Sequence, residues 1–193
     1  METEEKNILI CTVGMPGSGK SFVSDELVSR GFSFVRFGQI TLDEIIKKGL
    51  KPNEKNEKEV RERLRKQYGM GAYAILNIPK FDELLKKSNV VGDDLISWTE
   101  YKILKEKYGD LMKVIAVYAP PEMRYKRLAS RKAENDEKQR FRPFTEEEGK
   151  SRDYAEIENI EKGGPIAMAD FIIVNTGGKE DVKKRVSEIL FSL

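Results

Sequence analysis

The chain of 193 residues has no histidine and a single cysteine, Cys11. Without histidine, Ser-His-Asp catalysis, Cys-His catalysis and histidine zinc sites are excluded. One cysteine can form neither an internal disulfide nor a zinc cluster of cysteines. Histidine is the commonest metal ligand and the commonest general base of enzymes, so this protein lacks both.

The sequence also has little net charge and no long hydrophobic run. Thirty-five lysines and arginines oppose 33 aspartates and glutamates, so the formal net charge is +2 and no nucleic-acid partner is indicated. No apolar run approaches the roughly 20 residues that cross a bilayer. The first residues, METEEKN, lack the basic and apolar parts of a signal peptide. We therefore expect a cytoplasmic protein with no membrane partner.

Short apolar runs alternate with helical patterns along the whole chain. Runs typical of buried strands occupy residues 8–13, 33–37, 89–93, 113–118 and 171–174. The segments between them carry apolar residues at helical spacing, and strands that alternate with helices predict a parallel sheet. We expect one domain over residues 1–193, with an α/β fold of three layers: a five-stranded parallel sheet with helices on both faces.

Several features predict where helices begin or end. Thr41 with Glu44, and Ser97 with Glu100, have the spacing of capping boxes that open helices. Pro79 interrupts the apolar helical stretch 72–85. The mostly charged stretch 131–153 has the composition of an insert or lid.

Residues 14–21, GMPGSGKS, satisfy the phosphate-loop pattern G-x-x-x-x-G-K-[ST] between an apolar strand and an amphipathic helix. Gly14, Gly17 and Gly19 allow backbone angles that turn N–H groups inward around phosphate oxygens at a helix N-terminus. Lys20 is expected to reach the β- and γ-phosphates, and the Ser21 hydroxyl to hold Mg²⁺. The motif predicts binding of a nucleoside triphosphate with magnesium.

An acidic residue at the end of a neighbouring strand is expected to support Mg²⁺ or its waters. Asp93 ends the third expected strand and is the first candidate, with Asp94 in reserve. The alternative interpretation is a solvated carboxylate in a turn.

Arginines supply a second part of the predicted site. Arg124, Arg127 and Arg131 lie three and four residues apart, so a helix that begins at Pro121 displays all three on one side. Guanidinium groups near a phosphoryl group in transfer supply the charge stabilisation that this chemistry needs. Further arginines either bind phosphate or are ordinary solvated and glutamate-paired side chains; these are Arg61, Arg63, Arg65, Arg140, Arg142 and Arg152.

Four segments in order, GMPGSGKS, RERLRKQYGMGAYA, VIAVYAPPEMRYKRLASR and GGPIAMADFIIVNTGG, resemble those of the archaeal adenylate kinase-related proteins. This family is a branch of the P-loop nucleoside monophosphate kinase superfamily, which also includes adenylate kinase and dephospho-CoA kinase. The resemblance covers nearly the whole chain. It implies a P-loop NTPase fold with a substrate-binding helical region at about 38–88 and an arginine-bearing lid at about 124–153.

The motif and the resemblance together define the expected site. The expected catalytic residues are Lys20, Asp93, Arg127 and Arg131, and Ser21 with Asp93 is expected to hold Mg²⁺. The residues expected to bind ATP are Gly14, Pro16, Gly17, Ser18, Gly19, Lys20, Ser21, Phe22, Arg127, Asn175 and Gly177. The residues expected to bind the acceptor are Gln39, Arg63, Arg65 and Arg152.

The leading prediction is a phosphotransferase that moves the γ-phosphoryl group of Mg-ATP to a nucleoside monophosphate, with AMP first, or to the hydroxyl of dephospho-CoA. The alternative is a nucleotide-dependent binding or switch protein, or a slow ATPase. Gln39, Leu42 and Ile96 stand where such kinases usually carry aspartate or arginine, which favours the alternative. The lid arginines favour the enzyme.

Overall fold

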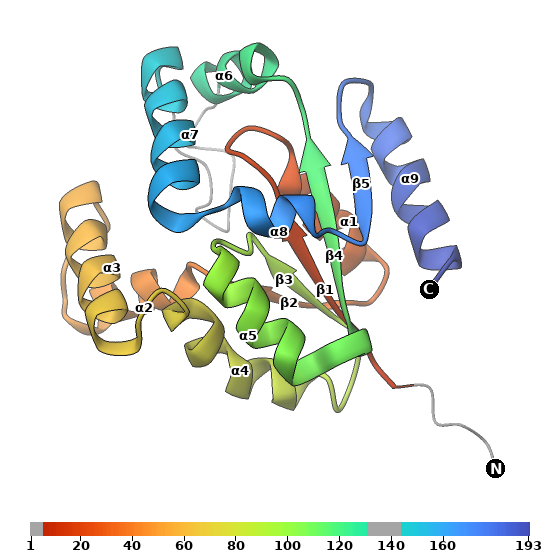
Figure 1. The fold of residues 1–193 in the computed structure, drawn as a ribbon, viewed down its shortest axis with the longest axis horizontal. Coiled ribbons are helices and arrows are strands. Elements are labelled where there is room, and N and C mark those ends of the chain that lie inside the picture. Colours follow the sequence, from red (N-terminus) through yellow and green to blue (C-terminus); the bar gives the residue numbers. More distant parts are fainter. Residues whose placement is uncertain (1–5, 131–143) are drawn as a thin grey trace.

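A five-stranded sheet lies at the centre of the protein, with helices on both faces (Figure 1). The computed structural model describes residues 6–130 and 144–193. All paired strands are parallel, in the order β2-β3-β1-β4-β5. The strands are β1 Leu9–Val13, β2 Ser33–Arg36, β3 Val90–Asp93, β4 Met112–Tyr118 and β5 Phe171–Val174. The predicted three-layer α/β fold is confirmed.

Helices fill the segments between the strands. They are α1 Lys20–Ser29, α2 Gln39–Lys47, α3 Glu54–Tyr68, α4 Ala72–Leu84, α5 Trp98–Tyr108, the 3₁₀ turn η1 Gly109–Leu111, α6 Pro121–Ala129, α7 Glu146–Ile160, α8 Gly163–Ala167 and α9 Lys179–Phe191. Helices α6 and α7 flank residues 131–143, the central part of the expected lid, which lie outside the described residues together with Arg131, Arg140 and Arg142.

The core has one apolar cluster on each face of the sheet. One cluster contains side chains from α2 to α5, and the other contains side chains from α1 and α9. The central strand β1 contributes to both, since all five of its residues are buried. Phe81 of α4 packs between Phe37 and Tyr108, with ring centroids 5.7 and 6.4 Å away. Burial on both faces explains why β1 reads as a continuous apolar run.

The carboxyl ends of the strands meet at one edge of the sheet. Val13 of β1 is in register with Ala116 of β4, and Arg36 of β2 with Asp93 of β3. In a parallel sheet every loop that follows a strand leaves from this same edge, which is where ligands bind in open α/β folds. The phosphate-loop residues after β1 and the acidic residues after β3 are therefore neighbours.

The predicted helix boundaries need two corrections. Helix α2 begins at Gln39, so Thr41 lies inside it, and its hydroxyl shares a hydrogen bond of 2.7 Å with Tyr73 instead of capping the helix. Helix α4 continues through Pro79 because the buried side chains on both sides of it, Asn77 and Phe81, hold the helix against the core. The Ser97–Glu100 capping box at the start of α5 is confirmed.

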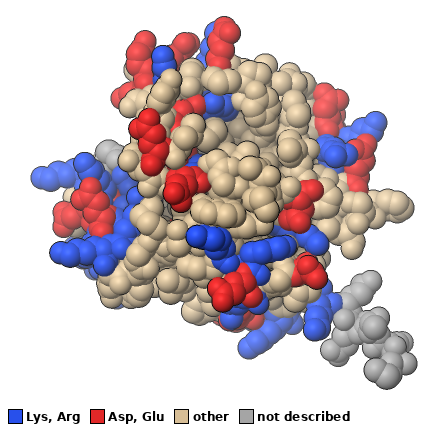
Figure 2. Space-filling model, in the orientation of Figure 1, with Lys and Arg blue, Asp and Glu red and all other residues tan. Residues whose placement is uncertain are grey.

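Charged side chains are unevenly distributed over the surface. In the view of Figure 2 they gather over α3 and along the edge formed by α4 and α5, whereas the face over β4 and β5 is largely uncharged. Tyr118, Ile172 and Val174 are exposed there. Among the described residues, no helix has the length and apolar character needed to cross a bilayer.

The aromatic cluster around Phe81 provides a test of the core. Phe81→Ala should lower the free energy of unfolding by about 3–5 kcal/mol, because the substitution removes a fully buried ring and leaves a cavity. Urea denaturation measures the loss. Ile75→Ala on the same helix is the control, since Ile75 is exposed and should cost less than about 1 kcal/mol. Equal losses for the two variants would contradict the packing described.

Candidate active site

The phosphate loop after β1 is in close contact with two other segments. Gly17 and Gly19 have φ angles of +81° and +102°, in the region that favours glycine. A Cβ atom at Gly17 would lie 2.6 Å from the carbonyl oxygen of Arg124, and one at Gly19 would collide with Asn175 Nδ2. A side chain at Gly17 or Gly19 is therefore excluded by atoms of Arg124 and Asn175 as well as by the φ angles of the loop.

Two side chains tie the loop to those segments. Arg124 of α6 donates from Nη1 to the Pro16 carbonyl at 3.1 Å. Asn175, which follows β5, donates from Nδ2 to the Ser18 carbonyl at 2.8 Å. These two bonds hold the loop in shape before any ligand arrives.

Arg124 makes a buried ion pair with Asp153 of α7. Its Nη1 and Nη2 atoms lie 2.8 and 2.5 Å from the two carboxylate oxygens, and both side chains are at least 93% buried. Tyr125 donates to the same carboxylate at 2.9 Å. Arg124 and Arg127 were expected on one side of α6, and the structure shows that the guanidinium of Arg124 is used to join α6, α7 and the phosphate loop.

Lys20 folds back over its own loop. Its Nζ donates to the carbonyls of Gly14 and Met15 at 2.8 and 3.4 Å, and it lies 3.4 Å from Asp94 Oδ1. Burial lowers the pKa of Lys20 below its ordinary value, although the Asp94 carboxylate acts in the opposite direction. The Lys20 ammonium group thus lies beside the glycine-rich phosphate loop. Phosphate oxygens can replace the carbonyl and carboxylate oxygens that it now contacts.

Asp93 is the acidic residue that faces α1. Its carboxylate is buried and accepts hydrogen bonds from the hydroxyls of Ser24 at 2.6 Å and Thr12 at 3.4 Å. Ser24 lies one helical turn after Ser21, so Asp93 and Ser21 are directed to the same end of α1. Hydroxyl and carboxylate oxygens are the ligands that Mg²⁺ prefers, and this donor set fits the ion.

Asp94 faces the lysines instead. Its Oδ1 atom lies 3.4 Å from Lys20 Nζ and 3.2 Å from Nζ of Lys162, at the start of α8. Lys162 also donates to Glu156 of α7 at 2.8 Å, and Arg152 donates to Glu156 at 3.1 Å. Burial alone would raise the pKa of Asp94, but the charges of Lys162 and Lys20 outweigh it and hold the pKa well below its usual range.

Sequence reasoning missed Lys162 and Glu156 as members of this site. Lys162 is 68 residues from Asp94 in the chain, and it belongs to no phosphate-binding motif. Burial would lower its pKa, but the Asp94 and Glu156 carboxylates raise it above its ordinary value, so Lys162 is charged. Arg152, predicted to bind the acceptor, is half-exposed and paired with Glu156.

Arg127 reaches the segment after β5. Its Nη2 donates to the Asn175 carbonyl at 3.0 Å, while Nη1 is buried without a hydrogen-bond partner in the part of the chain that the structure describes. The turn beyond Asn175 closes when the Gly178 N–H donates to Asp181 Oδ2 at 2.9 Å. Arg127 and Asn175 thus lie against the phosphate loop, and the ATP-binding role of these two residues and of Gly177 stays a prediction.

The remaining residues predicted to bind ATP occupy the loop and the first turn of α1. The Pro16 carbonyl is taken by Arg124, and Ser18 is buried with no partner for its hydroxyl among the described residues. Phe22 lies under the Lys179 ammonium, which is 5.7 Å from the ring centroid.

On the acceptor side, two of the predicted residues already have partners. Gln39 donates to Asp43 at 2.9 Å, and Arg63 donates from Nη2 to Glu44 at 2.6 Å. Arg63 and Arg65 each have a buried Nε atom that lacks a hydrogen-bond partner within the described ranges. Arg63 is thus only partly paired, through its Nη2 atom.

Arg36 is a further candidate that sequence reasoning missed. It ends β2 next to Asp93, and its buried Nη1 atom lacks a partner among residues 6–130 and 144–193. The sequence did contain a signal for Arg36, because this arginine stands near the carboxyl end of an expected strand. The expectation for Ile96 also needs a correction. Related kinases often have a D-G-x-x-R-like sequence after the third strand, and with Asp93 as its first residue the arginine position falls on Ser97, which caps α5, rather than on Ile96.

Glu100 is a buried carboxyl near this acceptor side. Its Oε2 accepts hydrogen bonds from the N–H groups of Ile96 and Ser97, both at 3.1 Å, and Oε1 has no partner in the described part of the chain. Burial raises the pKa of Glu100 to about 7, even though those two N–H groups and the charge of Arg65 favour the ionised form.

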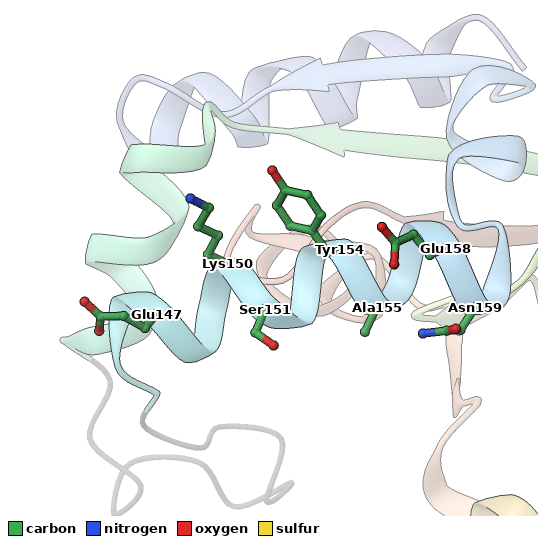
Figure 3. Close-up of a pocket in the computed structure, with 7 residues that line it drawn as sticks. All are labelled: Glu147, Lys150, Ser151, Tyr154, Ala155, Glu158 and Asn159. Carbon is green, nitrogen blue, oxygen red and sulfur yellow. The ribbon is translucent and has the colours of Figure 1, made fainter.

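A shallow hollow lies elsewhere, on the exposed side of α7 (Figure 3). It has a volume of about 500 Å³, and the residues that line it are Glu147, Lys150, Ser151, Tyr154, Ala155, Glu158 and Asn159. All of them belong to one helix and none belongs to the predicted site. We place the candidate active site at the phosphate loop, where converging groups from several elements meet.

Comparison with known proteins gives related sequences. A family model described as an AAA domain matches residues 10–159. The chain is 36% identical over 185 residues to a UPF0200 protein of Thermococcus gammatolerans, covering 95% of this chain and 94% of that one. It is 37% identical over 192 residues to a UPF0200 protein of Thermococcus kodakarensis, covering 96% and 100%. These names state no activity, so the resemblance to adenylate kinase-related proteins stays a prediction.

Solved structures give related folds. TT1252 from Thermus thermophilus matches with a TM-score of 0.65 and 20% identity, covering 98% of this chain and 99% of that one. A shikimate kinase from Acinetobacter baumannii in complex with shikimate matches with a TM-score of 0.56 and 16% identity, covering 97% and 95%. At these identities the likeness shows the fold alone, which is that of P-loop kinases.

Glu100 predicts a specific pH dependence of stability. Its pKa is about 7 in the folded protein against 4.5 ordinarily, so the folded state binds more protons between these values and stability falls as pH rises through them. Glu100→Gln removes the titration and keeps an oxygen acceptor. Relative to the unaltered protein, the variant should gain about 3 kcal/mol between pH 4.5 and 8, at about 1.4 kcal/mol per pH unit.

Urea denaturation across this range measures the difference. The chain has no histidine, so no imidazole titrates in the same window. Glu106→Gln, at an exposed position of α5, is the matched control and should leave the pH profile unchanged. A constant difference between Glu100→Gln and the unaltered protein would rule out the raised pKa.

Proposed function

The chain belongs to the UPF0200 family. From the geometry of its phosphate loop we propose that it is a Mg²⁺- and ATP-dependent phosphotransferase. The observation that carries the proposal is the loop itself. It is a glycine cradle at the start of α1, with the Lys20 ammonium beside it and two neighbouring segments that fix its backbone. Such a cradle binds phosphate before the chemistry begins.

Each group near the loop has a role in this reaction. The loop N–H groups and Lys20 neutralise the charge that develops on the phosphoryl group in transfer. Mg²⁺ supplies further charge neutralisation when it is bound, and Ser21 with Asp93 would hold it. Arg127 is held beside Asn175 through Nη2 and keeps its Nη1 donor open, and such a guanidinium can stabilise the transition state.

For the acceptor we propose AMP first, and a hydroxyl compound such as dephospho-CoA second. The region 38–88 between β2 and β3 is proposed as the acceptor-binding region, and residues about 124–153 as the lid. Two observations support an anionic acceptor: Arg36 and Arg65 both have buried guanidinium nitrogens without partners among the described residues. A guanidinium in this condition is stabilised by a phosphate ligand.

A second function, nucleotide binding with slow hydrolysis, is favoured by one observation. Arg63 and Gln39, both predicted to bind the acceptor, are held by the carboxylates of Glu44 and Asp43 at 2.6 and 2.9 Å. An acceptor must displace these partners before either side chain can bind it. In that case the protein would cycle between nucleotide-bound and nucleotide-free forms without a phosphorylated product.

One experiment separates the two functions. ADP formation from Mg-ATP is followed alone and with AMP, other nucleoside monophosphates, dephospho-CoA and shikimate, and any phosphorylated product is identified by mass spectrometry. We expect one acceptor to raise the rate well above hydrolysis. Tight ATP binding with slow hydrolysis that no acceptor accelerates would support the second function instead.

Lys20→Ala tests the nucleotide site itself. We expect a loss of about 10²-fold or more in ADP formation, because the developing charge loses its nearest cation. Lys87→Ala is the control, since Lys87 is exposed before β3, at the opposite edge of the sheet. If ATP affinity and turnover survive Lys20→Ala, the phosphotransferase proposal is wrong.

Arg127→Ala should lower the rate of transfer by about 10³-fold while leaving the fold intact, if its open nitrogen stabilises the transition state. The neighbouring Lys126→Ala, which breaks only an exposed pair with Glu122, is the control. Single-turnover kinetics at saturating ATP measure both. An unchanged rate in Arg127→Ala would remove this role from Arg127.

A further inference from the structure

Five charged side chains of alternating sign run from the phosphate loop to α7. They are Lys20, Asp94, Lys162, Glu156 and Arg152, and each neighbouring pair lies within 3.4 Å. Lys162 is the central member and is 98% buried. A lysine this deeply buried is rare unless it is paired. Its two carboxylate partners come from the turn after β3 and from α7.

The backbone at this pair of turns is strained. Among the described residues, Asp94 and Glu161 are the two residues other than glycine with a positive φ, at +67° and +53°. Asp94 is in the chain of charges, and Glu161 immediately precedes Lys162. Left-handed backbone at residues with side chains persists where the surrounding structure imposes it, and such residues cluster at functional sites. One of these residues is a member of the Asp94–Lys162 ion pair and the other adjoins it.

The two lysines share a single carboxylate oxygen. Asp94 Oδ1 lies 3.4 Å from Lys20 and 3.2 Å from Lys162. When Lys20 turns to a bound triphosphate it leaves Asp94, whose negative charge then stands beside the phosphates. Two like charges at short range repel each other strongly where water is scarce. A cation that stays with Asp94 removes this repulsion.

We propose that Lys162 is a positioning residue of the phosphate site, which holds and neutralises Asp94 so that Lys20 is free to bind the phosphates of ATP. This inference rests on the proposed ATP site. It assigns a role to a residue outside the phosphate-loop motif. Because Lys162 is also bound to Glu156, the same contact joins the occupancy of the loop to α7.

The role of Lys162 through Asp94 can be isolated with a double-mutant cycle. The four proteins are the unaltered chain, Lys162→Met, Asp94→Asn and the double variant, and the measured quantity is the dissociation constant of Mg-ATP by calorimetry. Lys162→Met should weaken binding about tenfold, because Asp94 then keeps Lys20 and repels the triphosphate. In the Asp94→Asn background the same substitution should change binding less than about twofold.

The cycle removes the contribution of Glu156, since Lys162→Met breaks the contact with Glu156 in both backgrounds. Lys162→Arg keeps the charge and should restore most of the affinity. Lys87→Met, at an exposed position before β3 and at the opposite edge of the sheet, is the matched control and should bind ATP normally. Thermal unfolding without nucleotide shows whether each variant is folded.

Asp94→Asn alone gives an independent result if Lys162→Met does not fold. Removing the carboxylate leaves both lysines to attract the triphosphate, so Mg-ATP should bind about threefold more tightly or better. Weaker binding in Asp94→Asn, or an equal loss on Lys162→Met in both backgrounds, overturns the inference while ATP binding stands. Absence of ATP binding by the unaltered protein overturns the proposed function and this inference together.

Discussion

The buried guanidinium of Arg124 is the interaction on which the rest of the site depends. It binds the carbonyls of Pro16 and Ala119 and both oxygens of Asp153, so one side chain fixes the phosphate loop, the end of β4 and α7 relative to one another. A buried ion pair of this kind offsets its own desolvation only when its geometry is good and further hydrogen bonds satisfy its donors, and here the guanidinium makes four hydrogen bonds. The ion pair therefore matters more for the relative placement of the phosphate loop, β4 and α7 than for the net free energy of unfolding.

The fold could be predicted from the sequence because its signals are local. The five strands read as apolar runs since β1 and β4 are covered on both faces, and the glycine pattern between β1 and α1 identifies the phosphate loop. The errors arose where packing overrides a local signal. Thr41 has the spacing of a helix cap, but its hydroxyl binds Tyr73, 32 residues away, and α4 passes through Pro79 because its flanking side chains are buried.

The site could be predicted only in part, for a related reason. Lys20 and Ser21 belong to a motif whose spacing is typical of phosphate binding, and Asp93 was identified by its place at the end of an expected strand. Lys162 has no such spacing, since the turn before α8 brings it to Asp94 from 68 residues away. Arg124 and Arg127 look alike in the sequence at three residues apart, yet one is fully paired inside the structure and the other keeps an open donor.

The strand order has a consequence for how the chain reaches this structure. The first strand made, β1, lies at the centre of the sheet, and its partners β3 and β4 begin at Val90 and Met112. During synthesis the apolar strand β1 therefore has no neighbouring strand to pair with until some 80 further residues have been added. Contacts so distant in sequence slow folding and leave apolar segments exposed to aggregation. The phosphate loop in turn gains its contact with Asn175 only after β5 has been made, because that side chain holds the Ser18 carbonyl from 157 residues away.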